Sequence, residues 1–308
     1  MPAPTTLVIG TRGSPLALAQ ARETAGRLSL ALGWAPERLP LKVIRTTGDA
    51  IQDRPLSEAG GKGLFTKELD VALLEGAIDL AVHSAKDLPT LLPEDLTIAG
   101  YLPREDARDA LISGLSATIA GLPRGATFGS ASLRREAMMR RLRPDLEVVL
   151  LRGNVGTRLD RVERGEIGVT LLAMAGLKRL GLVHRATAAL DPEVFLPAVG
   201  QGAIAITTRA RDAATRDAVD QITDPATGTA LLAERAFLTA LDGSCRTPIA
   251  GHATADAGGV SFRGLVLRPD GSDALGASGH GLAGDAEAIG REAAQGLLAR
   301  MPADYFSW

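Results

Sequence analysis

The sequence predicts an α/β protein that ends in a smaller α+β domain. Short apolar segments alternate with amphipathic helical segments over roughly the first 220 residues, a pattern typical of α/β folds with mainly parallel sheets. From Ile249 to about Leu282 the pattern changes to three alternating strands with Gly-rich turns. The chain has 308 residues, enough for two or three domains of the usual ~100–150 residues each.

The first part of the chain begins with a strand and a helix. Leu7–Ile9 is the expected strand, and Ser14 and Pro15 supply the N-cap and first helical residue of a helix that runs towards Leu32. The next expected elements are strands at 41–44 and 78–82 and a helix at 64–74. Residues 83–87 therefore follow a strand, at the edge where open α/β sheets bind ligands.

Two further strand–loop–helix units follow. Strand 127–129 leads through Ser130–Ser132 into an Arg-rich helix, and strand 148–151 leads through Arg152–Asn154 into a second helix. Small residues before a helix leave backbone N–H groups available to an anion. The remaining expected elements are a strand at 203–206, helices at 212–222 and 227–240, the three strands within 249–282, and a helix at 285–301.

The composition argues against two classes of protein. The net charge is −2 and the pI about 6.1, which disfavours a nucleic-acid-binding protein with a uniformly basic surface. Aromatic residues make up only 3% of the chain, too few for base-stacking platforms. No apolar stretch approaches the ~20 residues of a membrane helix, and no secretory signal is visible. With one cysteine, these features predict a cytoplasmic protein without disulfides.

Arginine is concentrated in one region. Between Arg124 and Arg164 there are ten arginines and five acidic residues, a local balance of +5. This predicts an anion-facing region within a mildly acidic protein, although at least half of these arginines are expected on solvated helix faces.

Cys245 is the only cysteine, in a loop of small residues that follows a helical segment. A lone cysteine is more often a small buried apolar residue than a reactive group. Gly243 and Ser244 leave little bulk around the sulfur, however, and Arg246 favours the thiolate, which is the nucleophilic form. An accessible thiol is therefore the favoured interpretation.

Seven motifs in order give the chain a close, nearly full-length resemblance to the hydroxymethylbilane synthases, also called porphobilinogen deaminases. Single motifs carry a false-positive risk, but seven in sequence over about 235 positions do not arise easily by chance. The motifs are Thr11–Ala17, Gly60–Phe65, His83–Pro89, Ser132–Arg135, Leu151–Arg158, Leu196–Gly202 and the loop around Cys245.

The resemblance implies two domains like those of type II periplasmic binding proteins around an active-site cleft, plus a small C-terminal α+β domain. The chain would cross between the first two domains twice. The implied ranges are 1–102 with 203–221 for domain 1, 103–202 for domain 2, and 222–308 for domain 3, which carries Cys245.

The reaction implied by the resemblance is the head-to-tail condensation of four porphobilinogen molecules, with loss of ammonia, to hydroxymethylbilane. It would take place on a dipyrromethane cofactor joined to Cys245 by a thioether. Asp87 would be the catalytic carboxylate, hydrogen-bonding pyrrole N–H groups, offsetting positive charge as the amine leaves, and moving protons. The alternative is that Asp87 only caps a turn before Leu88-Pro89.

Each porphobilinogen carries an acetate and a propionate, so the site needs fixed cations, and arginine binds carboxylates in a bidentate manner. Of the 34 basic residues, 29 are Arg, but only those within motifs are given roles. The residues expected to hold the cofactor are Cys245, Ser84, Lys86, Asp87, Ser132, Arg134, Arg135, Arg152 and Arg158. Those expected to hold substrate are Arg12, Ser14, Arg152, Arg158, Arg179 and Gln201.

Several interpretations remain open. His83, with the other three histidines, shows no metal-ligand spacing, so no metal is expected. Lys62 is either on a loop over the cleft or simply solvated, and Glu58 lies where many family members have a basic residue. The alternative function is a non-catalytic binding protein for a small dicarboxylate, which has no use for the thiol of Cys245. The favoured expectation is a monomeric enzyme without nucleic-acid or membrane partners.

Overall fold

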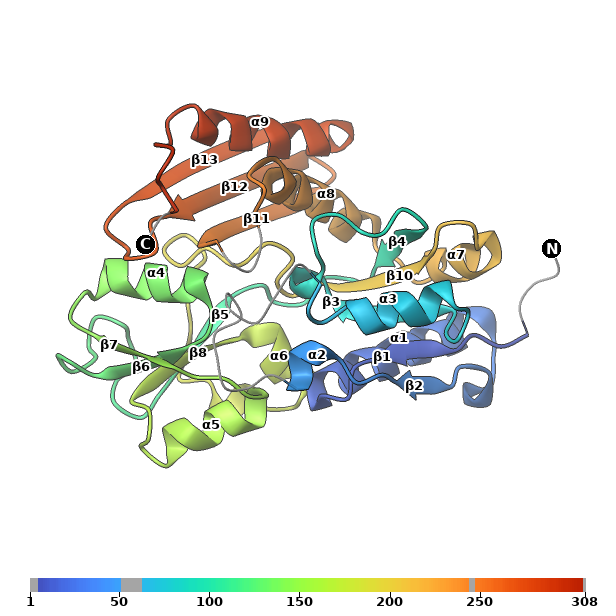
Figure 1. Cartoon of the computed structure of the whole chain (residues 1–308), viewed down its shortest axis with the longest axis horizontal. Coiled ribbons are helices and arrows are strands. Elements are labelled where there is room, and N and C mark those ends of the chain that lie inside the picture. Colours follow the sequence, from blue (N-terminus) through green and yellow to red (C-terminus); the bar gives the residue numbers. More distant parts are fainter. Residues whose placement is uncertain (1–4, 51–62, 244–246, 307–308) are drawn as a thin grey trace.

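The computed structural model describes residues 5–50, 63–243 and 247–306. In these segments the strands form two five-stranded sheets and one three-stranded sheet (Figure 1). The sheets lie within the three predicted domain ranges, and the exact boundaries between domains stay a prediction.

The first sheet has the strand order β2-β1-β3-β10-β4. The Ser14 hydroxyl accepts from the backbone N–H of Ala17, so the predicted N-cap of the first helix is confirmed. The strands are β1 (Ile9–Thr11), β2 (Leu41–Val43), β3 (Leu80–Ser84), β4 (Leu96–Tyr101) and β10 (Ile204–Arg209). The helices are α1 (Pro15–Leu32), α2 (Thr47–Ala50), α3 (Lys67–Leu74) and α7 (Ala213–Asp220).

The second sheet has the order β7-β6-β8-β5-β9. Ser132 and Asn154 cap its first two helices with their side chains, as small polar residues before a helix do. The strands are β5 (Asp109–Ser113), β6 (Thr127–Ser130), β7 (Glu147–Leu150), β8 (Val169–Ala173) and β9 (Ala188–Ala189). The helices are α4 (Leu133–Leu142), α5 (Val155–Glu163) and α6 (Met174–Arg179).

The expectation of mainly parallel sheets is wrong. In the first sheet β1 pairs in parallel with β2 and β3, whereas β10 is antiparallel to β3 and β4; the second sheet also has two parallel and two antiparallel pairs. Parallel neighbours need a crossover connection, usually helical, within one sheet. Strand β10 enters its sheet from the other domain, so it has no such connection.

Strand β3 also lies two residues later than predicted. Its antiparallel pairing with β10 extends to the pair Ser84 and Ile204, so His83 and Ser84 lie inside the strand rather than after it. The turn that follows is a 3₁₀ helix, η2 (Ala85–Asp87). The other 3₁₀ segments are η1 (Pro36–Arg38), η3 (Val183–Arg185) and η4 (Ala283–Asp285).

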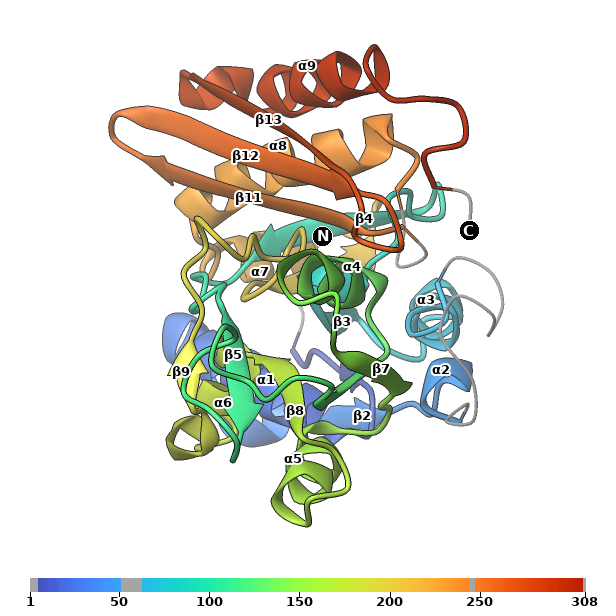
Figure 2. The same ribbon diagram turned by 90° about the vertical axis from the view of Figure 1, so that its left-hand side faces the viewer.

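The C-terminal α+β domain is confirmed as an antiparallel sheet with two helices, which lie to one side of the sheet in Figure 2. Its elements are α8 (Pro225–Ala240), β11 (Ile249–Asp256), β12 (Gly259–Leu267), β13 (Ala274–Gly281) and α9 (Ala286–Leu298). Ala85, Leu88 and Tyr101 of the first domain pack into the same core cluster as Phe237 of α8. The first and third domains therefore share apolar core.

A buried carboxylate joins all three domains. Glu234 on α8 is fully buried and accepts hydrogen bonds from both terminal nitrogens of Arg104, from Gly200 N at 2.7 Å and from Ala253 N at 2.7 Å. Arg104 follows β4 and Gly200 precedes β10, so they belong to the two segments that cross between the first two sheets. Through its hydrogen bonds to Arg104 and Gly200, Glu234 therefore attaches domain 3 to both crossings.

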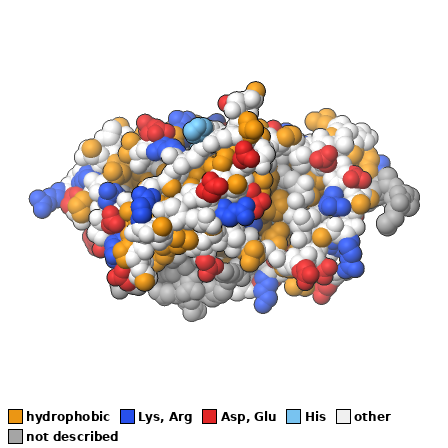
Figure 3. All heavy atoms as spheres, turned by 90° about the horizontal axis from the view of Figure 1, so that it is seen from above, with side chains coloured by type: hydrophobic (Ala, Val, Ile, Leu, Met, Phe, Trp, Pro, Cys, Tyr) orange, Lys and Arg blue, Asp and Glu red, His pale blue; other side chains and the backbone are white. Residues whose placement is uncertain are grey.

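One face of the molecule carries charges of both signs (Figure 3). On this face, seen from above in Figure 3, lysine, arginine and acidic side chains are interspersed, in keeping with a net charge near zero. Among the helices of residues 5–50, 63–243 and 247–306, none combines the length and apolar character needed to cross a bilayer.

Glu234→Gln should lower the free energy of unfolding by roughly 3 kcal/mol, because it leaves the buried charge of Arg104 without a counter-ion. Urea unfolding followed by fluorescence measures the change. Glu287→Gln is the matched control, since Glu287 pairs with Arg291 on the exposed face of α9 and should contribute under about 1 kcal/mol. Equal shifts in the two variants would contradict the importance of the buried pair.

Candidate active site

The predicted catalytic carboxylate lies at the end of β3, in the turn η2. Ala85 and Leu88 are buried in the core, and they flank the half-buried pair Lys86 and Asp87. Asp87 Oδ2 accepts from Arg12 Nη1 at 3.4 Å, and its side chain is 29% exposed. The carboxylate is thus held by a long contact to one arginine and remains open to further hydrogen-bond donors.

Lys86 is fixed from the second domain crossing. Its Nζ donates to Gln201 Oε1 at 3.2 Å, while Gln201 Nε2 donates to Ala107 O at 2.7 Å. Gly200 has a φ of 75°, and a Cβ there would lie 2.9 Å from the backbone nitrogen of Lys86. Glycine is therefore required for the crossing to approach the turn this closely.

The pKa of Lys86 is lowered to about 8, mainly by burial and then by the neighbouring charge of Arg135; Asp87 and Asp109 oppose the shift. Burial removes water from the ammonium group and so disfavours its charged form. An anion that binds beside Lys86 therefore stabilises its charged form.

Arg134 and Arg135 are held by one shared carboxylate. Asp109, fully buried at the start of β5, accepts from Arg134 Nη2 at 2.8 Å and from Arg135 Nε and Nη2 at 2.9 and 2.7 Å. Arg134 also donates to Leu196 O at 2.8 Å. One carboxylate does not neutralise two guanidinium groups, so this cluster keeps a net positive charge.

Arg158 on α5 is affected by the charges of Arg135, Arg152 and Asp87. Its Nε donates to Gly153 O at 2.8 Å, and its pKa is lowered to about 10 by burial and by the charges of Arg135 and Arg152. Asp87 acts in the opposite direction on this pKa. Charges from both α/β domains therefore interact at one junction.

Three predicted residues make other contacts. Ser14 caps α1, Ser84 exchanges hydrogen bonds with Gln20 of α1, and Arg179 Nε donates to Glu23 at 3.1 Å. Arg179 also donates to Gly202 O, so it links α6 to α1 and to the second crossing. Roles for Ser14, Ser84 and Arg179 in binding cofactor or substrate stay predictions.

The predicted attachment cysteine lies outside the described residues, as do Glu58 and Lys62. The preceding residues are described: α8 ends at Ala240, and Asp242 has a φ of 46°. This left-handed conformation, which Asp tolerates better than most residues, turns the chain out of α8 towards the loop of Cys245.

Sequence reasoning missed three residues that organise the site: Asp109, Gln20 and Glu234. The signal for Asp109 was present, because an acidic residue that opens an apolar strand has to be paired if it is buried. Nothing in the sequence indicated that its partners are Arg134 and Arg135, which lie 25 and 26 positions away.

His83 has a structural contact. Its Nε2 lies 3.0 Å from Thr207 Oγ1, and burial together with the charge of Arg12 lowers its pKa to about 3. His83 is therefore neutral at ordinary pH. In the part of the chain that the structure describes, no three His, Cys, Asp or Glu residues form a metal-ligating group.

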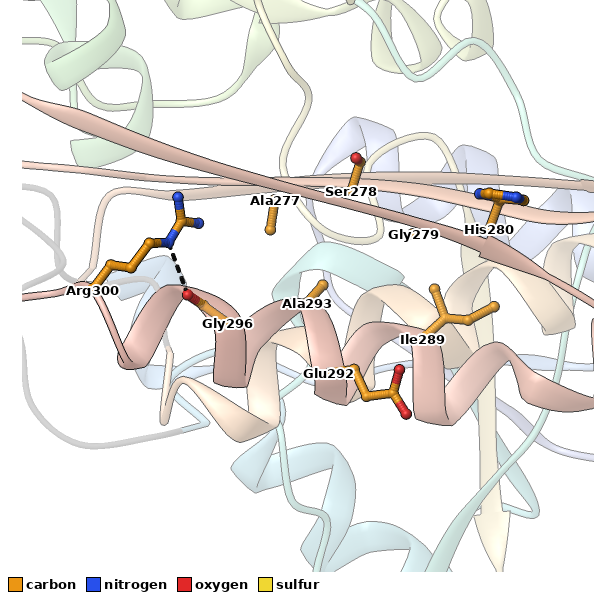
Figure 4. Close-up of a pocket in the computed structure, with 9 residues that line it drawn as sticks. All are labelled: Ala277, Ser278, Gly279, His280, Ile289, Glu292, Ala293, Gly296 and Arg300. Carbon is orange, nitrogen blue, oxygen red and sulfur yellow. Dashed lines mark hydrogen bonds between the residues drawn. The ribbon is translucent and has the colours of Figure 1, made fainter.

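A groove of about 360 Å³ lies elsewhere, between β13 and α9 (Figure 4). It is lined by Ser278, His280, Glu292 and Arg300, among others. Arg300 donates to Gly296 O and to Gly276 O, so it occupies a backbone carbonyl of the edge strand β13. None of the predicted site residues lines this groove.

Comparison with known proteins agrees with this arrangement. The model of the porphobilinogen deaminase dipyrromethane cofactor binding domain matches residues 7–217, and that of the porphobilinogen deaminase C-terminal domain matches residues 229–299. The chain belongs to the porphobilinogen deaminase family. The predicted resemblance is thereby confirmed, and with it the cofactor-binding domain and the two-part α/β fold with a C-terminal domain.

Individual porphobilinogen deaminases are similar over nearly the whole chain. The protein of Nitrobacter winogradskyi is 55% identical over 299 residues, which are 97% of this chain and 95% of that one. The protein of Paracoccus denitrificans is 53% identical over 300 residues, with 97% and 96% covered. Among solved structures, an ABC-transporter periplasmic substrate-binding protein of Coxiella burnetii has 15% identity and a TM-score of 0.46, covering 73% of this chain and 94% of that one.

The lowered pKa of Lys86 predicts a pH-dependent stability. Between pH about 8 and ~10.5 the unfolded chain binds a proton that the folded chain does not, so a rise in pH favours the folded state. Below about 8 both states are protonated and the full cost of burying the charge remains. Relative to Lys86→Met, the wild type should therefore gain stability between pH 7.5 and 9.5.

Urea midpoints measure this difference, with both proteins expressed in a host that makes no porphobilinogen so that no bound carboxylate adds charge. Lys178→Met is the control, because Lys178 is 40% exposed and paired with Glu105. The stability that the wild type gains with pH relative to Lys86→Met should exceed the gain relative to Lys178→Met. Equal gains would show that burial does not destabilise the charged form of Lys86.

Proposed function

We propose that this enzyme condenses four porphobilinogen molecules into hydroxymethylbilane, with Asp87 as the catalytic carboxylate and Cys245 as the attachment point of the dipyrromethane. Transferase activity of this kind follows from membership of the family. The observation that supports the residue roles is the position of Asp87, a partly exposed carboxylate among cations of both α/β domains whose charged forms are disfavoured by desolvation.

The described residues fit a dipyrromethane. Its two pyrroles carry four carboxylates between them. Within the described segments the site has four cations, Lys86, Arg134, Arg135 and Arg158, and only one buried carboxylate, Asp109, to offset their charge. Arg134 Nε is buried without a hydrogen-bond partner among the described residues. When bound, the dipyrromethane supplies the primer from which the tetrapyrrole grows.

The arginines differ in how they would bind carboxylates. Asp109 fixes Arg134 and Arg135, so these two guanidinium groups lose little conformational freedom when an anion arrives. Lys86 and Arg158 are destabilised as cations, and a bound carboxylate would relieve that destabilisation. We assign these four to the cofactor with Arg152, and Arg12 to substrate beside Asp87.

Asp87 has the properties that the reaction requires. Loss of ammonia leaves positive charge on the substrate pyrrole, and a carboxylate held in place stabilises that charge without first reorganising. The contact to Arg12 is long, at 3.4 Å, so the carboxylate oxygens can still accept from pyrrole N–H groups. Asp87 can also take up and return the protons that the condensation moves.

The alternative, a binding protein for a small dicarboxylate, accounts for the cations but gives no role to Cys245. We also propose that the protein is cytoplasmic and monomeric, and that it has no nucleic-acid or membrane partners. The low net charge supports the absence of nucleic-acid partners, and the single cysteine supports residence in the cytoplasm.

The thiol assignment predicts a covalent mass difference. Intact mass spectrometry of the wild type should show two pyrrole units beyond the polypeptide, and Cys245→Ser should show none, because an alcohol is a far weaker nucleophile than a thiolate. A catalytically active preparation with the unmodified polypeptide mass would exclude Cys245 as the attachment point.

The assignment of Asp87 predicts that Asp87→Asn folds normally but loses at least ~10²–10⁴-fold in kcat, as expected when a positioned acid–base group is removed. Asp87→Glu keeps the charge but displaces it, and such misplacement can still cost ~10²-fold. Ammonia release and melting temperature should be measured together. A turn-capping role predicts the reverse: lower melting temperature and nearly normal ammonia release.

A further inference from the structure

Two consecutive residues of α8 bind different parts of the active-site framework. Glu234 holds the domain crossings through Arg104 and Gly200. Arg235 Nη2 donates to the carbonyl oxygens of Pro89 and Thr90, both at 2.9 Å. These carbonyls lie two and three residues after Asp87, in the segment that leaves the catalytic turn.

The backbone between Arg235's contacts and Asp87 is stiff. Leu88 has φ −70° and ψ 140°, the extended conformation expected of a residue before proline, and Pro89 has its φ fixed by the ring. Leu88 is also buried with Ala85 in the cluster that contains Leu231 and Phe237 of α8. A shift of the Pro89 carbonyl is therefore transmitted to Asp87 rather than absorbed.

Helix α8 leads directly to the loop of Cys245. From Arg235 to the last helical residue, Ala240, the helix rises by about 7.5 Å, and Gly243 N then donates to Leu238 O at 2.9 Å, which folds the exit back onto α8. One rigid helix thus contacts the catalytic turn and begins the attachment loop.

We infer that Arg235 is a positioning residue: it fixes the backbone that carries Asp87 relative to the helix that leads to the cofactor-bearing cysteine. The inference rests on the proposed roles of Asp87 and Cys245. Condensation needs the growing chain and the carboxylate in a set relation, and displacement of about 1 Å in such a site can cost ~10²-fold in rate. Arg235 controls that relation from outside the reacting groups.

A purely structural role makes a different prediction. Arg235 lines a groove of about 600 Å³ between β4 and the helices α8 and α9, together with Leu232, Tyr101 and Arg291. Truncation of Arg235 would extend this groove rather than leave a sealed cavity, so only a modest loss of stability is expected. A large change in turnover would then have to come from the position of the catalytic turn.

The test compares Arg235→Met, Arg235→Lys and the control Arg291→Met, with Asp87→Asn assayed alongside. Arg291 lines the same groove but pairs with Glu287 on α9 rather than with the catalytic segment. For each variant, kcat and KM for porphobilinogen, the fraction carrying two pyrroles by intact mass, the melting temperature and hydrogen exchange of residues 85–88 are measured.

Arg235→Met should keep its cofactor, lose roughly 10- to 100-fold in kcat with KM changed by less than about threefold, and exchange its 85–88 amides faster. Arg235→Lys, which retains a cationic donor, should recover part of kcat, and Arg291→Met should match wild type. If Arg235→Met fails to fold, Arg235→Lys decides: a kcat more than about twofold below that of wild type, with a smaller loss than the roughly 10-fold expected for methionine, supports the inference.

Two failures can be told apart. In the first, Asp87→Asn is inactive but Arg235→Met turns over within twofold of wild type; where Arg235→Met does not fold, Arg235→Lys takes its place. Arg235 is then not a positioning residue, and the proposed function stands. Arg235 is equally excluded from that role if the melting temperature falls but kcat of the folded, loaded enzyme does not. If Asp87→Asn is itself fully active, the proposed catalytic site is wrong and the inference falls with it.

Discussion

The buried carboxylate of Glu234 is the interaction on which the arrangement of the three domains depends. It accepts from Arg104 on the first crossing, from Gly200 on the second, and from Ala253 in β11 of the third domain. A fully buried carboxylate without these donors would be strongly destabilising, so the donors have to remain together. The relative position of the crossings follows from that requirement.

In the described part of the active site, positive charges outnumber the negative charges that could neutralise them. Asp109 supplies one buried negative charge to Arg134 and Arg135, and the pKa values of Lys86 and Arg158 are lowered because burial and neighbouring cations disfavour their charged forms. This excess of desolvated positive charge is costly in the protein alone. It becomes favourable when several carboxylates bind, which suits a cofactor and a product that gain two carboxylates with each pyrrole.

Local signals in the sequence were sufficient for most elements. The N-caps Ser14 and Ser132 and the first-turn Pro15 begin helices where expected, and the switch to alternating strands after Ile249 marks the third sheet. These signals act over a few residues, so a single sequence contains them. The strand direction of β10 could not be found in this way, because it depends on the path of the chain between domains.

The sequence by itself determined the helix starts, the α+β end of the chain and, through seven ordered motifs, the family and the candidate residues. Only the tertiary structure decided which charges meet: Arg134 and Arg135 share Asp109, Arg179 pairs with Glu23, and Arg104 pairs with Glu234. The physical reason is range. Caps and periodicity are contacts between near neighbours in the chain, whereas these ion pairs join residues 25 to 156 positions apart and form only once the chain has folded.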